Sequence, residues 1–150
     1  MRVVIQRVKN AYVSIDAKIV GQIDKGLLVL LGIENNDTDK DVEWIFKKIV
    51  QMRIFSDEAD KMNLSIQDIG GNILLISQFT LFASTKKGNR PGFTEAARPE
   101  KSIPLYEKCI ATLNTLIGKK IETGMFGADM QVQLINDGPV TIIMDSKRPE

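Results

Sequence analysis

The stretch Asn72–Phe82 constrains the fold of this chain most, because it starts as a core segment and turns polar before it ends. It follows the breaker pair Gly70–Gly71 and begins with an uninterrupted apolar run, which is typical of a strand buried on both faces. Ser77, Gln78 and Thr80 then interrupt the apolar pattern, and buried polar groups are costly unless they are hydrogen bonded. Ligands of open α/β sheets bind beyond the carboxyl ends of strands. We therefore predict a central strand with a site at its C-terminal end, although these polar side chains could also simply satisfy a neighbouring turn.

The rest of the chain alternates strand and helix patterns. Period-two or continuous apolar patterns predict strands at Val3–Val8, Ala11–Ile15, Lys18–Ile23, Leu27–Ile33, Arg53–Phe55, Gln131–Ile135 and Val140–Met144. Apolar residues at helical spacing predict one helix over residues 39–51, with Thr38 as N-cap and Asp41 completing a weak capping box, and a second over Glu100–Ile117. Ser56–Gly71 is expected to be a long polar connection, and Pro139 to make a loop between the last two strands. The order predicts a mixed α/β domain with two main helices, about seven or more strands, and helices on one face of the sheet.

Length and composition indicate an ordinary globular protein. A chain of 150 residues is expected to form one domain over residues 1–150 that buries about two-thirds of its unfolded surface, with residues 146–150 as a flexible tail. The apolar runs are too short to span a membrane, and the first residues have no signal-peptide core. One cysteine cannot form an internal disulfide and suits a reducing cytoplasm. Cys109 falls in the buried stripe of the second helix, which indicates a packing role rather than a nucleophile.

Charged and titratable residues exclude several kinds of site. The net charge is only +1, so an RNA partner would have to be held by a local patch. Lys86, Lys87 and Arg90 concentrate positive charge in a loop beside the predicted site, where contact with phosphates and plain solvation are both open readings. Histidine is absent, which excludes a Ser-His-Asp triad, a Cys-His dyad and any histidine-based metal site. We expect neither a metal nor another cofactor.

Several strings resemble the signatures of the D-aminoacyl-tRNA deacylase family. The most specific are Ser-Gln-Phe-Thr-Leu at 77–81 and Asn-Asp-Gly-Pro-Val-Thr at 136–141. Shorter strings that also fit the family pattern are Ile5–Val8, Gly26–Gly32, Arg53–Phe55 and Ala128–Val132. The resemblance covers residues 1 to about 145. It implies a three-layer β/β/α fold built as a homodimer, in which the Gly138–Pro139 motif enters the neighbouring subunit's site.

The resemblance also implies a reaction, the hydrolysis of the ester between a D-amino acid and the terminal ribose of tRNA, with glycine as a further substrate. The partner would be the 3′-terminal adenosine and acceptor stem of an aminoacylated tRNA, with no DNA and no membrane. Backbone N–H groups around Gln78, Phe79 and Thr80 would stabilise the oxyanion, and the 2′-hydroxyl of the tRNA would activate the ester. Phe126 and Met130 would help to form the adenosine pocket. An aminoacyl ester is already labile, so positioning and fixed N–H donors suffice in a site without histidine.

Gly138 and Pro139 carry the expected selectivity. An X-Pro bond can be cis at a cost of about 0.5–1 kcal/mol, and a cis bond here would turn two carbonyls toward the substrate ammonium. The D side chain would then point outward, while an L side chain would strike backbone. Arg7, within an apolar strand, would brace this motif, although an edge-facing surface position is the plainer reading of the residue alone.

Four alternatives remain open from the sequence. Thr80 could act as a nucleophile, but no nearby histidine could serve as its base. Phe126 and Met130 could be core residues beside a bend. The protein could also be a related editing enzyme for an L-amino acid, whose Gly-Pro bond would be trans. Finally, it could be a non-catalytic RNA-binding module, which would need base-stacking aromatics on an exposed sheet.

Overall fold

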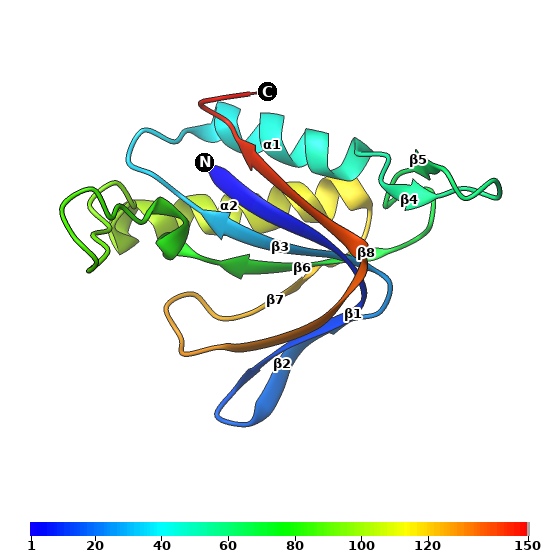
Figure 1. Ribbon diagram of the computed structural model, residues 1–150, viewed down its shortest axis with the longest axis horizontal. Coiled ribbons are helices and arrows are strands. Elements are labelled where there is room, and N and C mark those ends of the chain that lie inside the picture. The colour runs from blue at the N-terminus through cyan, green and yellow to red at the C-terminus, as the bar shows by residue number, and fades with distance from the viewer. Residues whose placement is uncertain (150) are drawn as a thin grey trace.

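The computed structural model describes residues 1–149 and contains eight strands, two α-helices and one short 3₁₀-helix within that range (Figure 1). The strands are β1 (Arg2–Ile15), β2 (Lys18–Ile23), β3 (Gly26–Gly32), β4 (Phe55–Ser56), β5 (Met62–Leu64), β6 (Asn72–Ser77), β7 (Glu122–Thr123) and β8 (Gln131–Asp145). The helices are α1 (Asp39–Gln51), α2 (Pro99–Ile117) and the 3₁₀-helix η1 (Phe79–Phe82). The predicted class, a mixed α/β domain with two main helices, is confirmed. No helix within residues 1–149 is long and apolar enough to cross a membrane.

The main sheet holds β6 as an interior strand between β3 and the short β7, rather than as its central strand, and the predicted burial of the apolar run is confirmed. Its strand order is β2-β1-β3-β6-β7, and β8 pairs with β1. β6 runs parallel to both β3 and β7, because α1 and α2 lie in the two crossover connections. The β1–β2 hairpin turns through Asp16 and Ala17, which both have positive φ, as a two-residue hairpin turn of the primed type requires.

Both helices begin and end as the sequence predicts, within one residue. The Thr38 N–H donates to the Asp41 carboxylate over 2.8 Å, which completes the capping box of α1. Pro99 occupies the first turn of α2, and Gly118 ends the helix in the left-handed region with φ 76°. The helices cover one face of the sheet (Figure 1) and enclose the larger apolar core, which includes Phe46 and the fully buried Cys109.

A second apolar core forms because the sheet curls. It contains Val8, Ala11, Val13, Ile23, Leu28, Leu74 and Ile76. β2 and β7, at the two ends of the strand order, come close enough that a Cβ on Gly21 would lie 2.5 Å from the Thr123 carbonyl oxygen. Glycine is therefore required at position 21 for the two edges to approach. The curl gives the domain one core on each side of its central strands.

Four predicted boundaries were wrong. The strand predicted at Arg53–Phe55 begins only at Phe55, so Arg53 and Ile54 precede β4. Residues 2–15 form one continuous strand rather than two, and β5 lies within the segment expected to be a polar connection. Pro139 lies inside the single long strand β8, not in a loop between two strands. Gln6 pairs with Thr141 and Val8 with Asn136. The four residues 137–140 of β8 therefore lie opposite a single residue of β1, Arg7. Pro139 is tolerated because it lies in this bulge, where no ladder hydrogen bond is needed.

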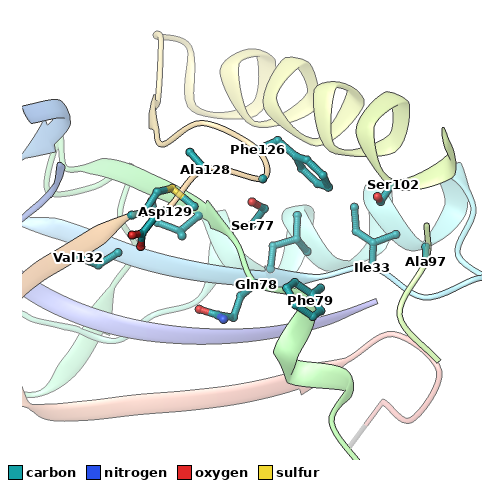
Figure 2. A pocket seen from close by; sticks show the side chains of 14 residues that line it. Ile33, Ser77, Gln78, Phe79, Ala97, Ser102, Phe126, Ala128, Asp129 and Val132 are labelled. Carbon is teal, nitrogen blue, oxygen red and sulfur yellow. The ribbon is translucent and has the colours of Figure 1, made fainter. Parts of the chain in front are cut away.

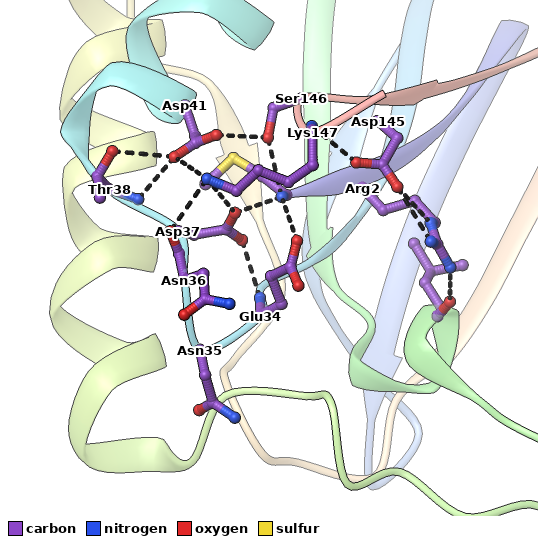
Figure 3. A network of polar contacts seen from close by, with 12 residues as sticks. Arg2, Glu34, Asn35, Asn36, Asp37, Thr38, Asp41, Asp145, Ser146 and Lys147 are labelled. Carbon is purple, nitrogen blue, oxygen red and sulfur yellow. Dashed lines mark hydrogen bonds and ion pairs between the residues drawn. The ribbon is translucent and has the colours of Figure 1, made fainter. Parts of the chain in front are cut away.

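A network of charged groups ties the end of β8 to α1 (Figure 3). The Asp41 carboxylate accepts hydrogen bonds from Ser146 Oγ at 2.7 Å and Lys147 Nζ at 2.8 Å. Asp37 pairs with the Met1 ammonium, and Arg2 with Asp145 at 3.0 Å. Ser146 and Lys147 are thus held in place, although residues 146–150 were expected to form a flexible tail. Glu150 lies outside the described residues.

Candidate active site

A cavity of about 260 Å³ opens at the C-terminal end of β6, where the sequence predicts the site (Figure 2). Its lining residues are Leu31, Ile33, Ile76, Ser77, Gln78, Phe79, Ala97, Ser102, Phe126, Gly127, Ala128, Asp129, Met130 and Val132. They come from β3 and the residue after it, from β6, η1, the residues before α2 and its first turn, the segment after β7, and the start of β8. Of the predicted site residues, Ser77, Gln78, Phe79, Phe126 and Met130 meet here.

At the end of β6, only the backbone groups on the side away from β3 can face the cavity. The Gln78 N–H donates to the Leu31 carbonyl of β3 over 2.7 Å. Since backbone groups alternate between the two sides of a strand, those of Ser77 face away from β3. β7 has already ended on that side at Thr123, which pairs with Leu75. The pocket occupies the space where a longer β7 would have continued.

The helix η1 determines which of the predicted oxyanion donors are available. The Gln78 N–H is already used by Leu31, so it is not a free donor, contrary to the prediction. The N–H groups of Phe79 and Thr80 have no acceptor within residues 1–149, as expected for the first residues of a helix. Phe79 is 57% exposed, and its ring meets Phe93 edge-on with centroids 5.1 Å apart.

Thr80 lies outside the cavity lining. Its side chain is exposed, and its hydroxyl accepts a hydrogen bond from the Gln78 amide. No basic side chain within the described residues contacts that hydroxyl. The arrangement lacks the adjacent base that a nucleophilic threonine needs.

Phe126 and Met130 form the wall opposite β6. The Phe126 ring packs on Tyr106 of α2, with centroids 5.7 Å apart, and lies between α2 and Ser77 (Figure 2). A Cβ on Gly124 would collide with Met130 Sδ, so glycine lets the Met130 side chain fold back over the segment. Both residues combine core packing with a pocket surface.

The sequence reasoning missed two polar lining residues. Ser102 lies in the first turn of α2 and donates to the Arg98 carbonyl at 3.0 Å. Asp129 is the one charged residue among the described lining residues and is exposed. A carboxylate between the two predicted residues Phe126 and Met130 was a signal that could have identified Asp129. Ser102 gave no such signal, because only tertiary packing brings α2 to the strand end.

Gly138 and Pro139 lie away from this cavity in the same chain. Their peptide bond is cis, as predicted, and both residues are exposed. They lie beside Arg7, which pairs with Leu27, whereas Ser77 pairs with Leu31. Four residues along β3 correspond to about 13 Å. One chain alone therefore does not bring the Gly-Pro motif to its own pocket.

Arg7 fixes the Gly-Pro bulge from within the core. It is only 9% exposed, so the reading as an edge-facing surface residue is wrong. Its Nε donates to the Asp137 carbonyl at 2.8 Å, and its Nη1 donates to the Ile54 carbonyl at 2.6 Å. The guanidinium thus links the strand carrying the motif to the chain entering β4.

The predicted cationic loop is closed by hydrogen bonds at its base. Ser84 and Gly92 exchange two backbone hydrogen bonds of 2.8 and 2.9 Å. Lys86, Lys87 and Arg90 lie between them and are all exposed, with no acidic partner in residues 1–149. The loop follows η1 directly, so its charges lie close in sequence to the pocket.

Cys109 and the acidic residues offer no alternative centre. Burial raises the pKa of the Cys109 thiol far above its usual range, which leaves it an inert core group. Within residues 1–149, no cluster of three or more His, Cys, Asp or Glu side chains could hold a metal ion. The cavity at β6 is therefore the candidate site.

Fold and pocket together define an α/β protein whose site is built from a strand end, backbone groups and apolar walls. A sequence model of the family described as D-Tyr-tRNA(Tyr) deacylase matches residues 4–145. The chain therefore belongs to this deacylase family.

Curated relatives match over the whole chain, and solved structures match over nearly all of it. D-aminoacyl-tRNA deacylases of Flavobacterium psychrophilum and Cytophaga hutchinsonii are 58% and 61% identical over 150 residues, covering all of both chains. A structure of the c-Myc DNA Unwinding Element Binding Protein matches with a TM-score of 0.92 and 39% identity, covering 97% of this chain and 98% of that one. A probable eukaryotic D-amino acid tRNA deacylase matches with a TM-score of 0.84 at 15% identity, over 95% and 97% of the two chains, which shows a shared fold.

Proposed function

We propose that this protein hydrolyses the ester bond of D-aminoacyl-tRNA, and of glycyl-tRNA, and thereby removes D-amino acids from tRNA in the cytoplasm. One observation carries the proposal: a pocket made by Ser77–Phe79 and Phe126–Met130 lies in a chain 58% identical, over its full length, to D-aminoacyl-tRNA deacylases. The experiment is to follow amino acid release from D- and L-tyrosyl-tRNA. Fast release from the D form alone supports the proposal, and equal release from both would contradict it.

The chemistry requires no side-chain nucleophile. Water would attack the ester carbonyl carbon, and the bond from that carbon to the ribose oxygen would break, which releases the amino acid and restores the tRNA hydroxyl. The carbonyl oxygen would become an oxyanion in the transition state, and fixed N–H donors stabilise such a charge. The free N–H groups of Phe79 and Thr80, and the outward-facing backbone of Ser77, are the available donors. The 2′-hydroxyl of the terminal ribose would assist from the substrate. A substrate ending in 2′-deoxyadenosine should therefore react slowly, and a normal rate with it would contradict this assignment.

Phe126 and Met130 would hold the terminal adenosine. Their apolar surfaces line the cavity opposite β6, and an aromatic ring offers a face on which a base can stack. Asp129 lies between them as an acceptor at the pocket edge. A tRNA whose 3′ end carries another base should bind more weakly, with the largest loss in affinity rather than in the rate of the bound ester.

The selectivity for D substrates would come from the Gly138–Pro139 motif of a second subunit. The motif is exposed, braced by Arg7, and about 13 Å along β3 from its own pocket. These facts support a homodimer in which each motif completes the other subunit's site. Backbone at that position would exclude an L side chain while leaving a D side chain free, which explains how one site could accept many D-amino acids.

Mixed dimers test this arrangement directly. Gly138→Ala would damage the motif, and Ala128→Trp would fill the cavity that Ala128 lines. Each variant alone should be nearly inactive. A dimer containing one subunit of each would have one intact site, made from the good pocket of the first and the good motif of the second. Recovery of activity on refolding the two together supports the exchange, and its absence would indicate that each motif serves its own chain.

Lys86, Lys87 and Arg90 would contact phosphates of the acceptor stem, because they are exposed and follow η1 in the chain.

The two alternative functions, a non-catalytic RNA-binding module and an editing enzyme for an L-amino acid, receive less support. A purely RNA-binding module would not require a pocket with apolar walls. An editing enzyme for an L-amino acid would also release the amino acid from L-tyrosyl-tRNA, so the comparison of D- and L-tyrosyl-tRNA tests this alternative.

A further inference from the structure

Tyr106 is a buried polar residue that the proposed reaction does not use. It lies in α2, is only 4% exposed, and donates its hydroxyl to the Leu75 carbonyl over 3.2 Å. Its ring packs on Phe126 with centroids 5.7 Å apart. One side chain therefore contacts the strand that carries Ser77 and the segment that forms the opposite wall.

The position of the Leu75 carbonyl explains why this bond matters. Since Gln78 bonds to β3, the backbone groups of Leu75 and Ser77 face the other side of β6. β7 ends there at Thr123, the residue paired with Leu75. The Tyr106 hydroxyl therefore supplies a hydrogen bond at the point where the neighbouring strand stops, and the next backbone groups on that side belong to Ser77.

We propose that Tyr106 is a positioning residue that takes the place of the missing strand: its hydroxyl fixes the end of β6, and its ring fixes Phe126. This inference rests on the proposed deacylase function. The two contacts predict two separable effects. Loss of the hydroxyl should disturb the backbone donors at Ser77 and lower kcat, whereas loss of the ring should also release Phe126 and raise KM.

The hydroxyl is suited to this role throughout the physiological pH range. Burial raises the pKa of Tyr106 to about 12, and the neighbouring Cys109 contributes in the same direction. The hydroxyl thus stays a protonated donor. The pH profile of wild-type kcat should accordingly show no step from this group between pH 6 and 9.

The first test compares Tyr106→Phe and Tyr106→Leu under conditions where circular dichroism shows that both are folded. Tyr106→Phe should lower kcat about tenfold with KM unchanged, since small misplacements of a reacting group are costly. Tyr106→Leu should lower kcat equally and also raise KM. Leu113→Ala, which removes a fully buried side chain from the same helix, is the matched control and should lower the Tm without changing either constant. A Tyr106→Phe enzyme with wild-type kcat and a lowered Tm would overturn the proposal.

The second test leaves the fold intact and does not depend on catalysis. The chain has two tyrosines, so labelling with 3-fluorotyrosine gives two ¹⁹F resonances. The resonance of Tyr12, whose hydroxyl forms an exposed hydrogen bond with Gln133, serves as the internal reference. The probe is 3′-deoxy-3′-(D-phenylalanylamino)adenosine, an amide that cannot be cleaved as the ester is. Its binding should shift the Tyr106 resonance and leave that of Tyr12 unchanged. Binding without a Tyr106 shift would overturn the proposal, while failure to bind at all would count against the proposed function itself.

Discussion

The pocket at the end of β6 and the polar network at the end of β8 differ in which groups make their polar contacts. In the network, side-chain charges are paired in the interior: Asp41 is bonded by Ser146 and Lys147, and Asp37 by the Met1 ammonium (Figure 3). In the pocket, Asp129 is the one charge among the described lining residues, and the useful donors belong to the backbone. The difference teaches that side-chain charge here stabilises the fold, whereas main-chain geometry shapes the site.

The largest effect should follow a change in main-chain geometry. Gly138 has φ 146°, and a Cβ there would lie 2.7 Å from Val140 Cγ2 and 2.9 Å from its backbone nitrogen. Gly138→Ala must therefore reshape the motif, and we expect kcat/KM for D-tyrosyl-tRNA to fall about 100-fold or more. Gly70→Ala, at another left-handed glycine with open space around it, should cost stability but little activity. If Gly70→Ala lost as much activity as Gly138→Ala, the loss at Gly138 would reflect general damage to the fold and not a role of the Gly138–Pro139 motif in the site.

The next effect concerns stability and the charged network. Burial alone would raise the pKa of Asp41, but hydrogen bonds from Lys147, Ser146 and Thr38 outweigh it and hold the pKa well below its usual range. A lowered folded-state pKa stabilises the protein above the unfolded value of about 3.9, and this stabilisation is lost as the pH falls through and below that value. Asp41→Asn should cost about 1–3 kcal/mol of unfolding free energy at pH 7 and flatten the acid limb of stability against pH.

Asp39→Asn is the control for that measurement. Asp39 lies in the same helical turn and pairs with Lys108 at the surface, where an ion pair contributes about 0–1 kcal/mol. Denaturant titrations at pH 7 and pH 3 should separate the two variants. At pH 7, kcat of both should equal that of the wild type, and a reduced kcat in Asp41→Asn would show that the network also serves the site.

A smaller effect should appear in tRNA binding. Replacing Lys86, Lys87 and Arg90 with alanine should weaken binding and lower the slope of log affinity against log salt, by roughly one unit for each phosphate that is no longer neutralised. The matched control replaces Lys9, Lys18 and Lys25, three exposed lysines near the β1–β2 hairpin. An unchanged slope in the first triple variant would mean that the loop faces solvent.

The smallest effect is expected at Thr80. Its hydroxyl is outside the cavity lining and accepts a hydrogen bond from Gln78, so Thr80→Ala should keep kcat within about threefold of wild type because a backbone donor remains in place. Single-turnover cleavage of D-tyrosyl-tRNA measures this. A loss of several orders of magnitude would make Thr80 a catalytic side chain, and the pocket would then no longer differ from the network in relying on its main chain.

The sequence predicted what depends on local patterns. The span of α1 followed from its apolar spacing and the Thr38 cap, and the buried β6 from its continuous apolar run. Ser77, Gln78, Phe79, Phe126 and Met130 do meet at one pocket. The bulge at Pro139 was missed because a proline reads as a break unless the pairing of the partner strand is known. Ser102 and Tyr106 were missed because only the packing of α2 brings them to the strand end.

The close approach of β2 and β7 at Gly21 has a consequence for how the protein can change. The segment that forms the wall of the pocket leaves the sheet directly after Thr123, the residue that Gly21 faces. The N-terminal hairpin is therefore part of the frame of the pocket, although it lies about a hundred positions earlier in the chain. Insertions at the exposed turn of Asp16 and Ala17 leave this frame untouched. Any side chain at position 21 would instead collide with the Thr123 carbonyl and displace the start of the wall. A substitution at a residue that does not line the pocket would therefore change which substrates the pocket accepts.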